Sequence, residues 1–257
     1  MSEVRDLQVP SGREPLSAVL RGPGELTLER RPRAPLRPWE VRIRVGLVGV
    51  CGTDRALLSG ALATRYPLVP GHEFVGEVIE VGDPRDAAWL GRRVCADINN
   101  TCLSRRRAAP CRACRLALPH HCQRRDVTGI HEAAGAFAEE LVAPAANLFA
   151  VPDSVSDLRA MFCEPLAAAL AAFERAPVGP GDVVVVLGAG RLGALIAAVA
   201  RRRGADVLAV GRSPRKLARC LALDCGELVR VDDPALSLRA RVDARTEGLG
   251  ADVVVEA

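Results

Sequence analysis

The sequence predicts an α/β fold in which a mostly β domain is followed by a doubly wound parallel sheet. Glycine and proline interrupt the first part densely, up to about residue 155, and segments of alternating apolar and polar residues lie between them. In the second part, continuous apolar segments alternate with helical patterns, which is typical of a parallel sheet buried on both faces. The length of 257 residues fits one large domain or two modest ones.

The first part begins with a polar stretch and continues with predicted strands. Residues 1–16 lack periodicity and are expected to form a flexible tail. Residues 25–29 and 41–45 alternate with period two, and residues 74–81 form an apolar segment that ends at a glycine. We therefore assign residues 17–155 to a mostly β domain with long loops.

The second domain is assigned to residues 156–257, where helical and strand patterns alternate. The expected elements are a helix at 166–175, a strand at 183–187, a helix at 192–199, a strand at 206–210, a helix at 217–223, and strands at 228–231 and 252–256. A complete dinucleotide-binding sheet has six strands in the order 3-2-1-4-5-6, and only four are counted. The chain is therefore expected to be truncated at its C-terminus.

Composition excludes several classes of protein. The net charge of +4 is small, and basic residues are spread along the chain with short clusters at 105–107 and 201–203. Aromatic residues make up only 3%, so we expect no nucleic-acid partner. No segment is long and apolar enough for a signal peptide or a membrane span, so we expect a cytoplasmic protein without a membrane partner. In a reducing compartment, nine cysteines indicate metal binding or catalysis more than disulfides.

A glycine motif lies directly between the predicted strand at 183–187 and the predicted helix that follows it. This context favours a dinucleotide-binding loop, in which one glycine permits the tight turn, the next lets the backbone approach a pyrophosphate, and the third allows the helix to pack closely on the strand. The helix N-terminus adds its N–H groups and dipole. The residues expected to bind the cofactor here are Gly188, Gly190, Arg191, Leu192 and Gly193.

The end of the second strand of this sheet indicates which cofactor is bound. An NAD site usually has an acidic residue there for the ribose 2′-OH. This chain instead has Gly211, which leaves space, and then Arg212, Ser213 and Lys216, which could hold a 2′-phosphate. The sequence thus favours NADP, with NAD kept open.

Four cysteines fall within 21 residues in a predicted loop, at Cys102, Cys111, Cys114 and Cys122. Four thiolates can complete a tetrahedral structural zinc site, which would cross-link a loop that has few apolar residues. Residues 103–110 make the first spacing long. The loop can bulge to accommodate them, or the site can be reduced to three thiolates or to none.

A second, dispersed set combines thiolate, imidazole and carboxylate side chains, in Cys-Gly-Thr-Asp at 51–54, Gly-His-Glu at 71–73 and Cys-Glu-Pro at 163–165. These are the ligand types of a catalytic zinc that keeps one position open. By spacing alone this set is only suggestive, because a single histidine is more often a structural residue than a ligand.

Residues 71–82 read Gly-His-Glu-Phe-Val-Gly-Glu-Val-Ile-Glu-Val-Gly, which resembles the zinc signature of the medium-chain dehydrogenase/reductase family. Further motifs occur in the family's order from about residue 18 onward, namely Cys-Gly-Thr-Asp at 51–54, the cysteine loop, Gly-Ala-Phe-Ala-Glu at 135–139, Glu-Pro-Leu at 164–166, and Pro-Gly-Asp at 180–182. The resemblance is to zinc-dependent alcohol dehydrogenases of the polyol and threonine dehydrogenase branch. It implies a GroES-like catalytic domain followed by a partial Rossmann domain, and a homo-oligomer for a full-length relative.

The resemblance also implies roles for individual residues. Cys51, His72 and Glu164 would bind the catalytic zinc, although Cys163 beside Glu164 leaves a shift of one residue open. Glu73 would be either a ligand or a nearby supporting carboxylate. Asp54 would orient the histidine.

The implied reaction is hydride transfer between a small alcohol or polyol, or its ketone or aldehyde, and NAD(P). Zinc would lower the pKa of the substrate hydroxyl, and Thr53 would carry its proton outward. One alternative is a truncated, catalytically silent protein that still binds zinc and nucleotide. Zinc-free quinone-reductase relatives are a third class, which the presence of Cys51, His72 and Glu164 disfavours.

Overall fold

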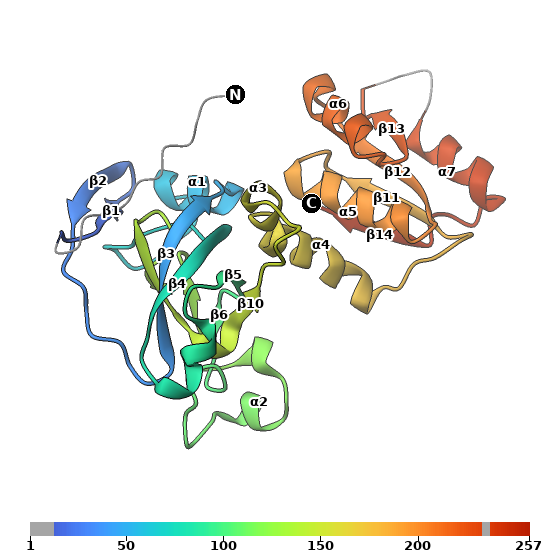
Figure 1. Ribbon diagram of the computed structural model, residues 1–257. Coiled ribbons are helices and arrows are strands. Elements are labelled where there is room, and N and C mark those ends of the chain that lie inside the picture. Colours follow the sequence, from blue (N-terminus) through green and yellow to red (C-terminus); the bar gives the residue numbers. More distant parts are fainter. Residues whose placement is uncertain (1–12, 233–236) are drawn as a thin grey trace. The chain divides into compact units, whose positions relative to one another are not determined.

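The computed structural model describes residues 13–232 and 237–257, which fall into two compact units, Met1–Glu164 and Pro165–Ala257 (Figure 1). Most of the expected N-terminal tail, residues 1–12, lies outside the described residues, and the first strand begins at Leu16. Among the described helices, none combines the length and apolar character that crossing a membrane requires.

The first unit is built on a five-stranded sheet in the order β10-β5-β4-β3-β9, with antiparallel neighbours. Its strands are β3 (Glu40–Val48), β4 (Phe74–Val81), β5 (Arg93–Ala96), β9 (Glu140–Pro144) and β10 (Leu148–Ala150). One face packs a core that includes Ile43, Phe74, Val78 and Leu141. The predicted strands at 41–45 and 74–81 are therefore confirmed.

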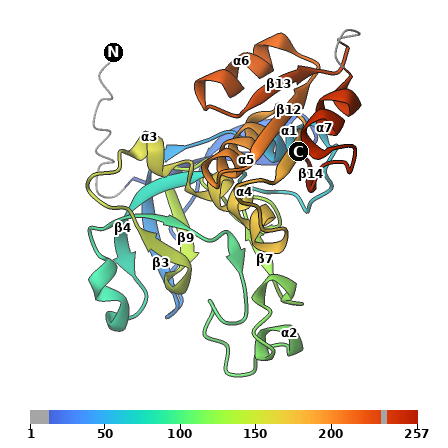
Figure 2. The same ribbon diagram turned by 90° about the vertical axis from the view of Figure 1, so that its right-hand side faces the viewer.

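Smaller elements surround this sheet. The two-stranded sheet contains β1 (Leu16–Gly22) and β2 (Glu25–Arg30), and the three-stranded one contains β6 (Asn99–Asn100), β7 (Asp126–Thr128) and β8 (Glu132–Ala133). The helices are α1 (Gly52–Ser59), α2 (Arg112–Arg115) and α3 (Asp157–Ala160), with 3-10 turns η1 (Pro84–Trp89), η2 (Pro119–His121) and η3 (Ala145–Asn147). The segment that carries α2 projects from the sheet of its unit (Figure 2).

One detail of β3 differs from the predicted alternation, in which Arg42 faces solvent. Arg42 is only 5% exposed. Its Nε donates to Glu80 Oε2 at 2.7 Å, and its Nη2 donates to the carbonyl of Ala34 at 2.7 Å. Because these partners replace water around the guanidinium, the strand can bury a charged residue at a position predicted to be polar and exposed.

The second unit is a parallel sheet in the order β13-β12-β11-β14, which is the 3-2-1-4 order of a doubly wound sheet. The strands are β11 (Val183–Leu187), β12 (Asp206–Gly211), β13 (Glu227–Arg230) and β14 (Val253–Glu256). The helices are α4 (Cys163–Arg175), α5 (Arg191–Arg202), α6 (Pro214–Ala222) and α7 (Leu238–Thr246). Apart from α7, each of these elements was predicted from the sequence.

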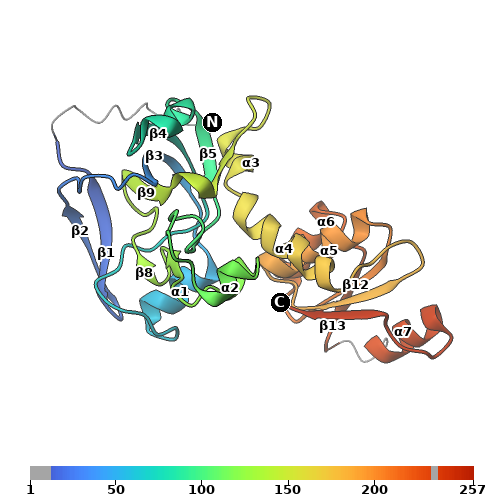
Figure 3. The same cartoon turned by 90° about the horizontal axis from the view of Figure 1, so that it is seen from below.

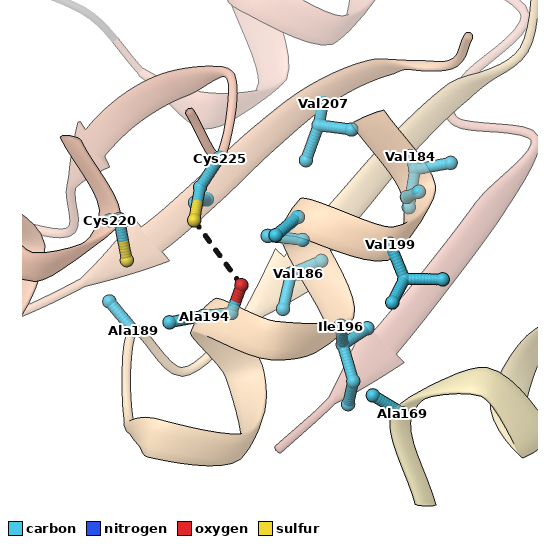
Figure 4. Packing of buried hydrophobic residues seen from close by; sticks show 14 of the residues in the cluster. Ala169, Val184, Val186, Ala189, Ala194, Ile196, Val199, Val207, Cys220 and Cys225 are labelled. Atoms are coloured by element: carbon cyan, nitrogen blue, oxygen red, sulfur yellow. Dashed lines mark hydrogen bonds between the residues drawn. The ribbon is translucent and has the colours of Figure 1, made fainter. Parts of the chain in front are cut away.

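Helices cover both faces of this sheet, which explains the continuous apolar pattern of β11. Val184 and Val186 pack with residues of α4, α5 and α6 on one face (Figure 4). Val185 packs on the other face with Val242 of α7. In Figure 3, α7 lies on the side of this sheet opposite α5. Since successive valines alternate between these two cores, no position from 184 to 186 favours a polar side chain.

Candidate functional site

Cys51 is placed at the start of α1, where it is the residue that precedes the first helical turn. Its backbone N–H donates to Asp54 Oδ2 at 2.7 Å, while Asp54 Oδ1 accepts from the backbone N–H of Gly71 at 3.1 Å. Asp54 is buried, so it links the segment of Cys51 to the segment of His72, the residue after Gly71. Two motifs that are separate in the sequence are thereby held together.

His72 is 3% exposed, and its Nδ1 lies 3.5 Å from Asp54 Oδ1. That contact falls short of a hydrogen bond, so Nδ1 is buried without a hydrogen-bond partner among the described residues. Burial alone lowers the pKa of His72, but contacts with Asp54 and Cys51 outweigh it and raise the pKa to about 10. The surroundings of the ring therefore favour a positive charge, whether from a proton or from a metal cation.

The structure brings a metal-ligand set together at this point. Ligand atoms of Cys51, His72 and Glu73 all lie within 4.8 Å of one another. A sulfur, a nitrogen and an oxygen from three residues match the protein ligands of a catalytic zinc that keeps one position open. The donor set fits such an ion, and Nδ1, which faces Asp54, leaves the other ring nitrogen to act as the ligand.

Glu164 is not a member of this group. The pKa of Glu164 is raised, mainly by burial; the charge of His72 lowers it and the charge of Glu73 raises it further. The carboxyl group of Glu164 therefore interacts electrostatically with two residues of the cluster. Cys163, the alternative ligand, is exposed, and hydrogen bonding with Cys95 lowers its pKa to about 7. The carboxylate grouped with Cys51 and His72 is thus that of the residue directly after the histidine.

Thr53, the residue proposed to carry the substrate proton, is partly exposed in the first turn of α1. None of the hydrogen bonds found among the described residues involves its hydroxyl.

Gly49, which directly follows β3, also contributes to this cluster, although no sequence motif pointed to it. A Cβ at Gly49 would lie 2.6 Å from Glu73 Oε2 and 3.4 Å from Met161 Sδ, so the absence of a side chain makes room for the carboxylate.

Replacing Gly49 with alanine is expected to push the Glu73 carboxylate away from Cys51 and His72. Because displaced ligands or their supports cost about 10- to 100-fold in metal affinity or activity, we expect a loss of that size in metal affinity. Competition with a chromogenic chelator measures it, and Gly52→Ala is the matched control, since a Cβ there meets nothing within 4 Å. Unchanged affinity in Gly49→Ala would argue against Glu73 as a ligand.

The four loop cysteines form a second cluster. All are buried, and their sulfur atoms lie within 4.8 Å of one another. Sγ of Cys122 lies 3.8 Å from that of Cys111 and 3.7 Å from that of Cys102. A tetrahedron with Zn–S bonds of about 2.3 Å has S–S edges of about 3.8 Å, so the spacing fits a tetrathiolate zinc ion.

The long spacing between the first two of these cysteines is absorbed by a compact turn. Backbone N–H groups of Arg105 and Arg107 donate to the carbonyls of Thr101 and Cys102 at 3.2 and 3.0 Å. Arg106 adopts a left-handed conformation with φ 47°. The inserted residues therefore bulge and return the chain to the cluster.

The thiols of the cluster differ in their pKa values. Backbone N–H groups lower the pKa of Cys111 to about 6, while burial raises that of Cys114 to about 12.

The glycine motif of the second unit has the geometry expected of a dinucleotide-binding loop. Gly188 has φ 115°, and a Cβ on Gly193 would lie 1.8 Å from the carbonyl oxygen of Gly188. Gly190 precedes α5, and a Cβ there would meet nothing within 4 Å, which leaves the backbone open to a ligand. Arg191 and Leu192 form the first turn of this helix.

The last residue of β12 and the residues after it lie beside the glycine loop. A Cβ on Gly211 would approach Ala189 Cβ at 2.8 Å, so this position packs against the glycine loop. Arg212 and Lys216 are exposed, and Ser213 precedes α6 without donating or accepting a capping hydrogen bond through its side chain. The edge beside the loop is therefore basic and carries no carboxylate from residues 211–216.

Comparisons with known proteins show which family the chain resembles. Residues 37–153 match the alcohol dehydrogenase GroES-like domain. The chain is 30% identical to the sorbitol dehydrogenase of Halalkalibacterium halodurans, over 91% of this chain and 67% of the relative. It is 32% identical to the erythritol/L-threitol dehydrogenase of Mycolicibacterium smegmatis, over 97% of this chain and 70% of the relative.

A solved structure shows the same fold. It is described as a short chain alcohol dehydrogenase, RspB, from Escherichia coli CFT073 in complex with NADH, and it superposes with a TM-score of 0.85. The sequence identity is 27%, with 96% of this chain and 70% of that chain covered. The expected GroES-like and Rossmann architecture is confirmed. The chain belongs to the alcohol dehydrogenases of the medium-chain dehydrogenase/reductase family.

Proposed function

We propose that this protein is a zinc-dependent dehydrogenase that transfers a hydride between a small alcohol or polyol and NADP. The observation that carries the proposal is the cluster of Cys51, the buried His72 and Glu73, whose ligand atoms lie within 4.8 Å of one another. Zinc, when bound, supplies a Lewis acid that lowers the pKa of the substrate hydroxyl. The polyol class is proposed because it is printed in the names of the sorbitol and erythritol/L-threitol relatives.

The residues around this site have separable tasks. Cys51, His72 and Glu73 would hold the metal, and Asp54 would orient His72. Glu164, whose charge interacts with His72, would provide a further carboxylate at the same site. The hydroxyl proton of the substrate would leave by way of Thr53. The hydride would pass from the carbon that carries this hydroxyl to the nicotinamide, so the two-electron oxidation of the alcohol is balanced by reduction of the cofactor.

The four-cysteine cluster is proposed to hold a second, structural zinc ion. Its sulfur spacing supports this role, and among the described residues the partly buried Ala113 is the one apolar side chain packed against it. The metal would therefore substitute for a hydrophobic core in this segment.

Metal analysis combined with an oxidation screen tests the proposal on this chain. Two equivalents of zinc and NADP-dependent oxidation of a polyol are the expected result. Zinc and nucleotide binding without turnover would support the alternative, a catalytically silent binding protein. Absence of zinc at Cys51 and His72 would contradict the proposal and favour the quinone-reductase class.

Cofactor preference is expected to depend on Arg212. If its guanidinium holds the 2′-phosphate, Arg212→Ser should weaken NADPH binding about tenfold or more and leave NADH binding unchanged, because a charge-assisted hydrogen bond is lost only with the phosphorylated cofactor. Arg215→Ser, an exposed neighbour in α6, is the matched control. Fluorescence titration gives both dissociation constants. If the wild-type chain binds NADH as tightly as NADPH, or more tightly, the proposed preference for NADP is wrong.

A further inference from the structure

The segment that carries the four-cysteine cluster is strongly basic. Residues 98–125 contain seven arginines and no aspartate or glutamate. The whole chain has 31 acidic residues in 257, so a stretch of 28 residues at the average frequency would contain about three. The arginine-rich composition of the chain does not explain an absence of acidic residues. We call residues 98–125 the basic lobe.

Only two of these arginines have a carboxylate partner. Arg105 pairs with Asp126, and Arg106 Nη2 lies 2.6 Å from Asp86 Oδ1. Within residues 13–232 and 237–257, no carboxylate lies within salt-bridge distance of the other five, which are Arg107, Arg112, Arg115, Arg124 and Arg125. All five are exposed.

Three of the five help to hold the lobe together through neutral acceptors. Arg115, Arg124 and Arg125 donate to the carbonyls of Pro110, Ala109 and His120 at 2.7, 3.3 and 3.0 Å. These bonds orient the guanidinium groups but leave their charge uncompensated. Four thiolates around a zinc ion would carry a net charge of −2, which is smaller than the charge of the five arginines. The surface of the lobe is therefore positive with the metal or without it.

The same lobe exposes large apolar side chains. Leu103, Leu116 and Leu118 are 46%, 57% and 50% exposed, and none of them belongs to the cysteine cluster. Aromatic residues are absent from residues 98–125. Nucleic-acid binders use arginine with stacking aromatics, and exposed leucines add nothing to contacts with phosphates. Arginine interspersed with leucine is instead suited to a surface that offers both negative charge and hydrocarbon.

We propose that the basic lobe docks on an anionic phospholipid surface. The lobe projects from the sheet of its unit, which leaves its loops accessible (Figures 1 and 2). The arginines would lie against lipid phosphates and the leucines would enter the region between headgroups and acyl chains. Reversible binding of this kind needs no membrane-spanning segment, so it is compatible with the absence of spanning helices among the described residues.

Co-sedimentation of the full chain with vesicles tests the proposal. Binding is expected to phosphatidylcholine vesicles that contain phosphatidylglycerol, to weaken with salt, and to be absent with phosphatidylcholine alone. Arg107→Gln with Arg112→Gln should weaken partitioning about thirtyfold. The side chains of these two arginines have no hydrogen bonds among the described residues, so their replacement leaves the lobe's internal contacts intact. Arg201→Gln with Arg202→Gln, which removes the same charge from α5, is the matched control and should bind normally.

The exposed leucines distinguish a lipid surface from other polyanions. Leu116→Ser with Leu118→Ser should reduce vesicle binding roughly tenfold, because insertion of both side chains is lost. Binding to a duplex DNA oligonucleotide, measured by fluorescence anisotropy, should be weaker than vesicle binding. Failure to bind anionic vesicles, loss of binding in the α5 control, or DNA binding that exceeds vesicle binding and ignores the leucines would each overturn the proposal.

Discussion

Replacing Cys51 with serine is expected to remove one of two zinc equivalents and to reduce turnover by at least about a hundredfold. The Cys51 sulfur is one of three ligand atoms that lie within 4.8 Å of one another, and as a zinc-bound thiolate it would add negative charge beside the buried His72. A neutral hydroxyl supplies neither the charge nor the soft donor that zinc prefers, and a catalytic metal accounts for several kcal/mol of transition-state stabilisation. Zinc analysis and steady-state kinetics on the same preparation measure both effects.

Two comparisons make this experiment specific. Cys95→Ser, a buried thiol of the same unit outside both metal clusters, should keep both zinc ions and its activity. Nucleotide affinity should be unchanged in Cys51→Ser, because the glycine loop belongs to the other unit. If Cys51→Ser retains turnover and two zinc ions, the assignment of the catalytic site is wrong.

Replacing Cys114 with serine is expected to release the other zinc ion and to unfold the basic lobe locally. The four sulfur atoms and Ala113 are the only core of this segment, and its leucines are exposed. A structural zinc site contributes on the order of 10 kcal/mol, so the remaining contacts should not hold the loop without it.

Limited digestion with trypsin measures this local unfolding, because trypsin cleaves after arginine and the lobe contains seven arginines. Cleavage within residues 105–125 should become at least about tenfold faster in Cys114→Ser and in the chelator-treated parent chain. The strands of the five-stranded sheet should remain protected. Equal cleavage rates and undiminished zinc in Cys114→Ser would contradict a structural metal in this cluster.

Local patterns were sufficient to predict the regular elements. The strands at 74–81 and 183–187 have the predicted bounds, because alternating or continuous burial depends only on neighbouring residues. The glycine motif likewise needs only the adjoining strand and helix, and both are present. Arg42 shows the limit of this reasoning, since its burial depends on Glu80, which lies 38 residues away in the chain.

The candidate sites likewise depend partly on local sequence patterns and partly on long-range contacts. The ligand types, the glycine loop and the four cysteines of the lobe could all be recognised from residue identity and spacing. The folded chain was needed to show that Glu73 joins Cys51 and His72, that Gly49 makes room for it, and that the bulged loop closes the cysteine cluster. Metal-ligand geometry depends on long-range contacts, such as the buried Asp54 that binds the backbone of both Cys51 and Gly71. Residue type and spacing do not encode such a contact.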